Sequence, residues 1–387
     1  MQDCLPFGTA LESCFLTLAA GATLGLALLA KTNAIVLPPV ILIAVLIHGH
    51  VRPERQFALR LRHLAAASVL SLYVINLGYG AEGSFTRLGD YRFYSKAFTG
   101  DGMPGGQSRL HGPIWDQIPV PLPAAMLEGM DLQKVDFENP RGGIRTYLRG
   151  QWYDHSWWWY YLYVVAVKVP VGTWVLVIMG SVICARSLSP QRLEVSCFVV
   201  LPAVALFLPA CLQTGFGAGI RYVMPAFPFI FLLAGAVFCI RSSKVIVAIG
   251  TLALILGPLA SLRTYPHSLC YFNELGGGPQ NGDFHLIDSN MEWGQNLMYV
   301  DEWVKSHADE SPLYVAQWSF YPIENFGIRF TEPTIGKDEP IAPGTYLISV
   351  NYLRGNRDMR RMPLRRFLEL VPDEKIAYTT YVYRIRQ

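Results

Sequence analysis

The chain has little charge for its length. Charged residues make up 16% of its 387 residues and hydrophobic residues 52%, whereas a soluble domain is typically about 25% charged. This deficit argues against a fully soluble protein, and the hydrophobic content excludes a disordered chain. The net charge of +3 is too small to indicate a nucleic-acid partner on its own.

Motifs of several common enzyme classes are missing. The sequence contains no GxxxxGK[ST], GxSxG, HExxH or DxD pattern, which removes the usual support for an ATP-driven pump, a serine hydrolase and a zinc peptidase. The seven cysteines are an odd number and none has CxxC spacing, so neither a zinc site nor a disulfide framework is indicated. No cofactor is predicted, and no residue spacing indicates a divalent metal.

Long apolar runs are what the sequence does contain. A helix needs about 20 apolar residues to cross the hydrocarbon of a bilayer. Seven segments qualify as candidate spans, although the first two are short and could form a tight hairpin. They are 14–30, 34–48, 63–80, 158–183, 196–213, 222–240 and 245–262.

The positive charges of the short loops test this topology independently, because cytoplasmic loops are enriched in lysine and arginine. If all seven segments cross, the basic loops fall on one side and the N-terminus lies inside. The basic residues are Arg52, Arg55, Arg60 and Arg62 after the second run, Arg186 and Arg192 after the fourth, and Arg241 and Lys244 after the sixth.

The predicted fold is therefore a polytopic α-helical membrane protein with about seven transmembrane helices, multi-pass in the plasma or inner membrane. Residues 1–80 hold the first helices, 81–157 form an extracytoplasmic loop, 158–262 hold the remaining helices and 263–387 form an extracytoplasmic α/β domain. In that domain, Ser289 or Asn290 is expected to cap a helix over 291–306. Strands are expected over 313–318, 346–350 and 379–385.

Three cations lie near the predicted outer leaflet. Lys168 is about ten residues into the fourth run and precedes Pro170, while Lys31 and Arg221 lie at the outward ends of the first and sixth runs. Charge within a membrane is costly, so these residues are candidates for binding the phosphate of a lipid carrier. The alternative is that they snorkel toward the lipid headgroups.

The densest polar cluster follows the last apolar run. Carboxylate, amide and aromatic groups of this kind can hold the hydroxyls and the ring faces of a sugar. They also serve as caps and turns, and Asp288-Ser289-Asn290 is typical of an Asx turn that opens a helix. The candidate sugar or acceptor ligands are His267, Asn273, Glu274, Asp288, Asn290 and Trp293.

With these residues in view, the chain resembles membrane glycosyltransferases of the dolichyl-phosphate-mannose protein mannosyltransferase type, family 39 of the C-type superfamily. Matching stretches cover most of the chain, and the most specific are 221–228 and 288–296. The others are 25–31, 119–123, 147–150, 158–161, 168–170 and 266–277.

The resemblance implies a hexosyltransferase of protein glycosylation. Such an enzyme moves a sugar with inversion from a polyprenyl-phosphate donor to a protein or lipid-linked acceptor at the outer membrane face. It also implies a catalytic acidic residue in the first outward loop. In this chain only Asp3 and Glu12 precede the matching core, and the topology places both inside, so the catalytic residue is unknown. The chain is expected to be the C-terminal part of a longer or split enzyme, with a separate N-terminal half as partner, or an inactive member.

Two rival functions remain open. One is a non-catalytic membrane protein that binds polyprenyl phosphate or a glycan. The other is a transporter, which would show inverted repeats and polar residues at mid-membrane. Lys168 is the one residue found that suits the transporter.

The orientation can be tested with a single added cysteine. If residues 263–387 face outward, a cysteine replacing Asn281 should react with an impermeant thiol reagent in intact cells, because the reagent reaches only the outer surface. The chain without the added cysteine gives the background. Protection at this position, together with labelling near Gln56, would reverse the orientation.

Overall fold

The computed structural model describes residues 10–51, 57–100, 103–138, 145–186, 190–213, 215–217, 219–239, 243–336, 339–355 and 359–386. The chain divides into two compact units. The first contains residues 1–141, 180–215 and 223–236, and the second contains residues 142–179, 216–222 and 237–387.

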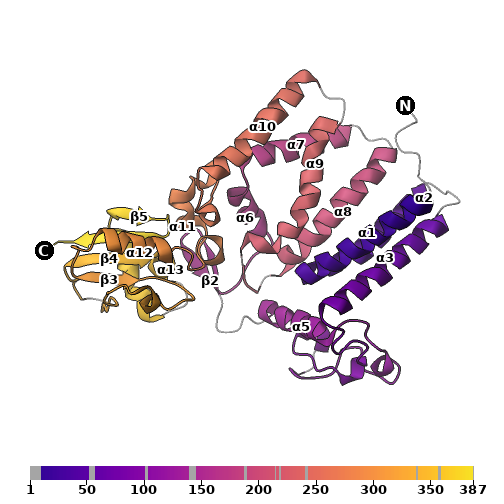
Figure 1. Ribbon diagram of the computed structural model, residues 1–387, viewed down its shortest axis with the longest axis horizontal. Coiled ribbons are helices and arrows are strands. Elements are labelled where there is room, and N and C mark those ends of the chain that lie inside the picture. Colours follow the sequence, from indigo (N-terminus) through magenta and orange to yellow (C-terminus); the bar gives the residue numbers. More distant parts are fainter. Residues whose placement is uncertain are drawn as a thin grey trace. The chain divides into compact units, whose positions relative to one another are not determined.

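Helices with closely approaching backbones build the first unit (Figure 1). α1 (Ala10–Ala30) packs along α3 (Phe57–Gly78), and α2 (Leu37–Val51) packs on α8 (Pro190–Leu212). A Cβ atom on Gly21 would lie 2.7 Å from the Ala67 carbonyl oxygen, and one on Gly25 would lie 2.7 Å from the Val74 Cβ. Small residues at these positions therefore let α1 and α3 come together, as is common between membrane helices. η1 (Thr32–Val36), η5 (Met224–Ala226) and most of α9 (Phe227–Cys239) complete the helical part.

A folded loop region follows α3 in the same unit. It contains η2 (Leu88–Asp90), α4 (Lys96–Thr99), η3 (Trp115–Gln117) and α5 (Ala124–Glu138). The buried Asp131 carboxylate accepts hydrogen bonds from the main-chain N–H groups of Tyr94 (2.7 Å) and Ser95 (3.0 Å). The Asp131 side chain of α5 thus accepts hydrogen bonds from the main-chain N–H groups just before α4.

The second unit begins with a short hairpin, β1 (Thr146–Leu148) and β2 (Gln151–Tyr153), and continues into α6 (Tyr160–Lys168). α7 (Val171–Arg186) follows after a bend of 114° at Val169-Pro170. α7 packs closely on α10 (Lys244–Leu262), since a Cβ on Gly172 would lie 2.3 Å from the Ala253 carbonyl oxygen. The segment predicted as one outer loop, 81–157, is thus shared between the two units.

Three described helices are long and apolar enough to cross a membrane: Ser13–Ala30 within α1, then α3 and α10. A fourth span results if the bent pair α6–α7 is counted as one. The other predicted runs form shorter apolar helices, over Thr32–Ile47, Cys197–Leu212 and Met224–Phe238. A membrane location is therefore compatible with these helices, whereas the number of seven spans and their orientation stay predictions. Arg52, Arg55 and Arg241, on which the orientation partly depends, lie outside the described residues, as does the side chain of Arg192.

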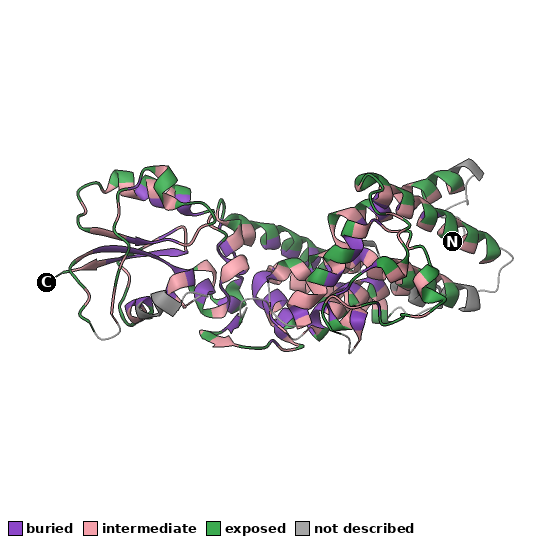
Figure 2. Ribbon diagram, turned by 90° about the horizontal axis from the view of Figure 1, so that it is seen from below, coloured by how far each residue is buried: buried purple, intermediate pink, exposed green. Residues whose placement is uncertain are grey.

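The C-terminal part of the second unit is a three-layer α/β fold. A four-stranded sheet has the order β3-β4-β6-β5, in which β3 and β4 are parallel and the other pairs antiparallel. α12 packs on one face, with Val300 and Trp303 against Leu347 and Val382. α13 and η11 cover the other face, so the strands are buried between two layers (Figure 2). The strands are β3 (Leu313–Ala316), β4 (Gly344–Ser349), β5 (Glu374–Ile376) and β6 (Thr380–Ile385), and the helices are α12 (Leu297–Ser306), α13 (Val350–Leu353), η10 (Ile323–Phe326) and η11 (Met359–Glu369).

The sequence predicted β3, β4 and β6 but not β5, and it misplaced the helix before them. α12 begins at Leu297, with Asn296 as its N-cap, rather than at Met291. Residues 288–290 form the separate turn η9 (Asp288–Asn290), whose main chain is held by distant residues instead of continuing into a helix. The other short turns between α10 and α12 are η6 (Ser268–Cys270), η7 (Glu274–Gly276), η8 (Pro279–Asn281) and α11 (Gly282–His285).

A buried ion pair connects α11 to the sheet layer. Arg354 Nη2 lies 2.6 Å from the Asp283 carboxylate, and Tyr381 Oη donates to the same carboxylate over 2.9 Å. The Arg354 side chain is 19% exposed and the Asp283 side chain 5%. Removing one partner of such a pair leaves an uncompensated buried charge, which is far more costly than losing a surface pair.

Asp283→Ala should therefore reduce the free energy of unfolding by about 3 kcal/mol, measured by near-UV circular dichroism of the detergent-solubilised full chain. Asp301→Ala is the matched control, because Asp301 pairs with the exposed Lys305 one helical turn away. Its cost should be about 0.5 kcal/mol or less. Equal losses for the two variants would contradict the structural role given to Asp283.

Candidate functional site

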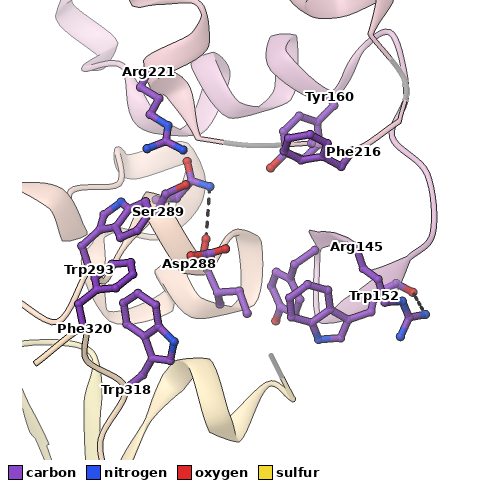
Figure 3. A pocket seen from close by; sticks show the side chains of 14 residues that line it. Arg145, Trp152, Tyr160, Phe216, Arg221, Asp288, Ser289, Trp293, Trp318 and Phe320 are labelled. Atoms are coloured by element: carbon purple, nitrogen blue, oxygen red, sulfur yellow. Dashed lines mark hydrogen bonds between the residues drawn. The ribbon is translucent and has the colours of Figure 1, made fainter. Parts of the chain in front are cut away.

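A pocket of about 160 Å³ lies within the second unit (Figure 3). Because an apolar cavity of about 150 Å³ can hold benzene, the pocket has room for one small ring. Residues from four separate parts of the sequence line it. They are Arg145, Tyr147, Trp152, Tyr160, Phe216, Gly217, Arg221, Ile287, Asp288, Ser289, Asn290, Trp293, Trp318 and Phe320.

The polar side of the pocket is the turn η9. Asp288 has a φ of 58°, in the left-handed region that residues with a Cβ rarely adopt. Its main-chain N–H donates to Asn351 Oδ1 over 3.0 Å, and its carbonyl accepts from Met291 N (2.8 Å) and Glu292 N (2.9 Å). The main chain is thereby fixed in a strained conformation, and such strain is concentrated at functional sites.

An aromatic wall stands beside this turn. The rings of Trp293 and Phe320 stack with their centroids 5.0 Å apart and an interplanar angle of 16°, and Trp318 packs edge-on against Phe320. Figure 3 shows the three rings together on one side of the pocket. Trp293 remains 37% exposed, so its ring can contact a ligand. Gly294 permits this packing, because a Cβ there would lie 3.0 Å from the Ser319 Cα.

The hairpin β1–β2 supplies another part of the lining. Tyr147 and Trp152 pack edge-to-face with centroids 5.2 Å apart. Both are anchored, since Tyr147 Oη donates to the Asp283 carbonyl over 2.8 Å and Trp152 Nε1 donates to the Arg354 carbonyl over 2.6 Å. The exposed Arg145 Nε lies 2.7 Å from the Asp154 carboxylate. Figure 3 places Arg145 and Trp152 across the pocket from Trp293.

Arg221, in η4 (Ile220–Tyr222), brings a positive charge to the pocket. Its guanidinium carbon lies 5.3 Å from the ring centroids of both Tyr222 and Trp293. The segment before it approaches η9 closely, since a Cβ on Gly219 would lie 3.0 Å from the Ser289 hydroxyl oxygen. The Ile220 N–H donates to Asn290 Oδ1 over 3.3 Å, which connects this segment to the polar side of the pocket.

Four residues predicted from sequence, Arg221, Asp288, Asn290 and Trp293, therefore line one pocket. Lys168 and Asn273 have other positions. The buried Lys168 ammonium donates to the carbonyls of Leu269 (2.7 Å) and Asn290 (2.8 Å), so it supports the pocket from behind and does not line it. Asn273 is 1% exposed and donates to the carbonyls of Ala166 and Val169 at the helix break.

The remaining candidates also lie away from the lining. The His267 ring packs edge-on against Tyr299 with centroids 4.6 Å apart, and burial lowers the pKa of the His267 imidazole. Glu274 is exposed in η7. Lys31 belongs to the first unit, where it is the N-cap residue of η1. Among the described residues, no group of three or more histidine, cysteine, aspartate or glutamate side chains is placed to hold a metal ion.

The combination of groups indicates the chemistry of a ligand. A concave site with aromatic walls and a few convergent polar groups is typical of small-molecule binding. Carboxylate and amide oxygens can accept hydrogen bonds from hydroxyl groups, and a guanidinium binds phosphate or carboxylate oxygens. Sequence reasoning missed Trp318 and Phe320 because they follow a strand with no motif around them. The hairpin residues Arg145 and Trp152 were missed because 81–157 was taken as one loop.

The strain at Asp288 can be measured by comparing two substitutions that both remove the carboxylate. Asp288→Ala keeps a Cβ at positive φ, whereas Asp288→Gly adopts this conformation freely. We expect the glycine variant to be more stable than the alanine variant by about 1 kcal/mol, as measured by thermal unfolding. Equal stability would mean that the turn changes its backbone conformation once the carboxylate is gone.

No protein-family model, no curated protein and no solved structure matches this chain. The resemblance therefore rests on the sequence motifs alone. The function has to be argued from the residues of the pocket and the helices of the same unit.

Proposed function

We propose that this chain acts in a membrane glycosyltransferase that moves a sugar from a polyprenyl-phosphate donor to an acceptor at the outer membrane face. The observation that carries the proposal is one pocket that combines the guanidinium of Arg221, the carboxylate of Asp288 and the ring of Trp293. These residues come from the two sequence stretches that most specifically resemble family 39 glycosyltransferases, 221–228 and 288–296.

The groups of the pocket fit the two parts of a lipid-linked sugar. The faces of Trp293 and Phe320 can cover the apolar face of a sugar ring, while the Asp288 carboxylate can accept hydrogen bonds from its hydroxyls. Arg221 can form charge-assisted hydrogen bonds with a phosphate. The same unit contains α10, α6 and residues 171–179 of α7, which belong to helices apolar enough to lie in a membrane and to contact an isoprenoid chain.

Glycosyl transfer of this type breaks the bond between the anomeric carbon and a phosphate oxygen and forms a bond to the acceptor oxygen, whose proton leaves to a base. The phosphate departs with the bonding electrons, so a cation beside it lowers the barrier. Arg221 is the residue we assign to this role. Asp288 is assigned to binding of a sugar or acceptor hydroxyl, and the base stays unassigned.

A binding protein without catalysis is the second candidate. It is favoured by the presence of a single described carboxylate, that of Asp288, among the residues lining the pocket. Such a protein would hold a polyprenyl-phosphate sugar through the same contacts and would not cleave it.

The proposal is tested by measuring binding of polyprenyl phosphate, with and without one mannosyl group, to the full chain in nanodiscs. Arg221→Met should weaken binding of both ligands about tenfold or more, because a hydrogen bond to a charged group contributes about 1.5–3 kcal/mol. Trp293→Ala should weaken binding of the mannosylated carrier only. Lys168→Met should weaken both, since its ammonium holds the Asn290 carbonyl.

Lys244→Met is the control, because Lys244 is an exposed cation at the start of α10 and does not line the pocket. Its binding should equal that of the unaltered chain. Binding followed by transfer of labelled mannose to an acceptor would establish an enzyme, and binding without transfer would establish the second candidate. Absence of binding by the unaltered chain, or equal binding by the Arg221 and Lys244 variants, would refute the proposal.

A further inference from the structure

In sequence, Glu292 lies between the lining residues Asn290 and Trp293, but it is not part of the pocket lining. Its side chain is fully buried, with 0% exposure. The carboxyl oxygens accept hydrogen bonds from Gln317 Nε2, from Ser349 Oγ and, over 3.3 Å, from Asn351 Nδ2. All three partners are neutral, and they come from the ends of β3 and β4 and from α13.

Asn351 connects this carboxyl group to the pocket. Asn351 is 0% exposed, and its side-chain amide has two partners in opposite directions. Nδ2 donates to Glu292, while Oδ1 accepts the main-chain N–H of Asp288 over 3.0 Å. Ser349 Oγ accepts the Asn351 main-chain N–H over 3.2 Å, which fixes the start of α13 to the same carboxyl group. The left-handed main chain of Asp288 is therefore held by an amide whose orientation Glu292 sets.

The carboxyl group has an unusual environment for an acid. Burial raises the pKa of Glu292 to about 8, although the hydrogen bonds from Ser349 and Gln317 oppose the increase. The Cys270 thiol of η6 interacts electrostatically with Glu292, and burial raises the pKa of that thiol to about 12. The Lys168 ammonium lies behind Cys270 and is bound to the carbonyls of Leu269 and Asn290. Glu292 is thus a group of this cluster that changes charge near pH 8.

We propose that Glu292 is a positioning residue, which holds Asn351 against the main chain of Asp288 and so sets the ligand-binding conformation of the pocket. A neutral carboxyl group fits a cavity of neutral partners, whereas a buried carboxylate without a cation is unfavourable. Raising the pH through the pKa of Glu292 therefore favours conformations in which this group reaches water. Those conformations release Asn351 and, with it, Asp288.

The part of the inference that concerns ligand affinity rests on the proposed function. If only the conformation with neutral Glu292 binds, the apparent dissociation constant rises with the fraction that is ionised, by about tenfold at one pH unit above the pKa. The unaltered chain should then bind mannosylated polyprenyl phosphate about tenfold more weakly at pH 9 than at pH 7. Glu292→Gln, which stays neutral, should bind equally well at both pH values.

A second measurement needs no ligand. With 5-fluorotryptophan incorporated, the ¹⁹F resonance of Trp293 is assigned by its loss in Trp293→Phe. It should shift with a midpoint near the Glu292 pKa in the unaltered chain and should be independent of pH in Glu292→Gln. Asn351→Ala should displace this resonance at every pH, because the link to Asp288 is missing. Asp301→Asn, a substitution in α12 at the partner of the exposed Lys305, is the control and should keep the titration.

The two readouts separate the two proposals. If the unaltered chain binds no ligand and the Trp293 resonance still titrates in a Glu292-dependent way, the proposed function fails and the positioning role stands. The positioning role is overturned if Glu292→Gln shows the same pH dependence as the unaltered chain. It is also overturned if Asn351→Ala leaves the resonance unchanged.

Discussion

The buried ammonium of Lys168 is the constraint on which the second unit depends. It ends α6 immediately before Val169-Pro170, where the chain turns by 114° into α7. A cation in this position needs acceptors, and it takes the carbonyls of Leu269 and Asn290. The break also frees carbonyls of α6, and the Asn273 side chain donates to two of them, over 2.6 Å at Ala166 and 2.7 Å at Val169. One interruption in an apolar helix thereby binds two segments that follow it by more than a hundred residues, 269–273 and the turn at Asn290.

The segment 287–293 is held from two sides as a result. Lys168 binds its main chain from the helices, and Glu292 with Asn351 binds it from the sheet layer. Leaving a buried polar group unsatisfied costs about 1–3 kcal/mol, so releasing either attachment is unfavourable. The pocket can keep a strained residue, Asp288, because the surrounding contacts determine its conformation. The aromatic wall then follows, since Trp293 is adjacent to Glu292 in sequence.

Local patterns in the sequence predicted the features that depend on local physics. Apolar runs located the helices, and runs of β-branched and aromatic residues located β3, β4 and β6. The start of α12 was wrong because Asp288-Ser289-Asn290 has the composition of a helix cap. Its main chain is instead satisfied by Asn351, 63 residues away. For the site, residue type sufficed to identify Arg221, Asp288, Asn290 and Trp293. It could not identify Trp318, Phe320 or Arg145, whose positions follow from the ends of β3 and β1. Residue type also could not show that the Lys168 ammonium is hydrogen-bonded to main-chain carbonyls.

A buried acid at position 292 is hard to explain by stability alone. An apolar residue of similar size would avoid the cost of desolvation, and replacing buried polar networks by apolar groups is often neutral or favourable. An apolar side chain would, however, remove the acceptor of Asn351 Nδ2 and leave Gln317 Nε2 with the Trp318 carbonyl alone, 3.2 Å away. The carboxyl group fixes both, since each oxygen accepts from a different amide. The orientation of Asn351 then determines whether its Oδ1 or its Nδ2 faces the Asp288 N–H, and only the first can hold it. Glu292 thus lowers the stability of the fold somewhat but holds the turn in a single conformation. A binding pocket requires such a fixed conformation, whereas a core does not.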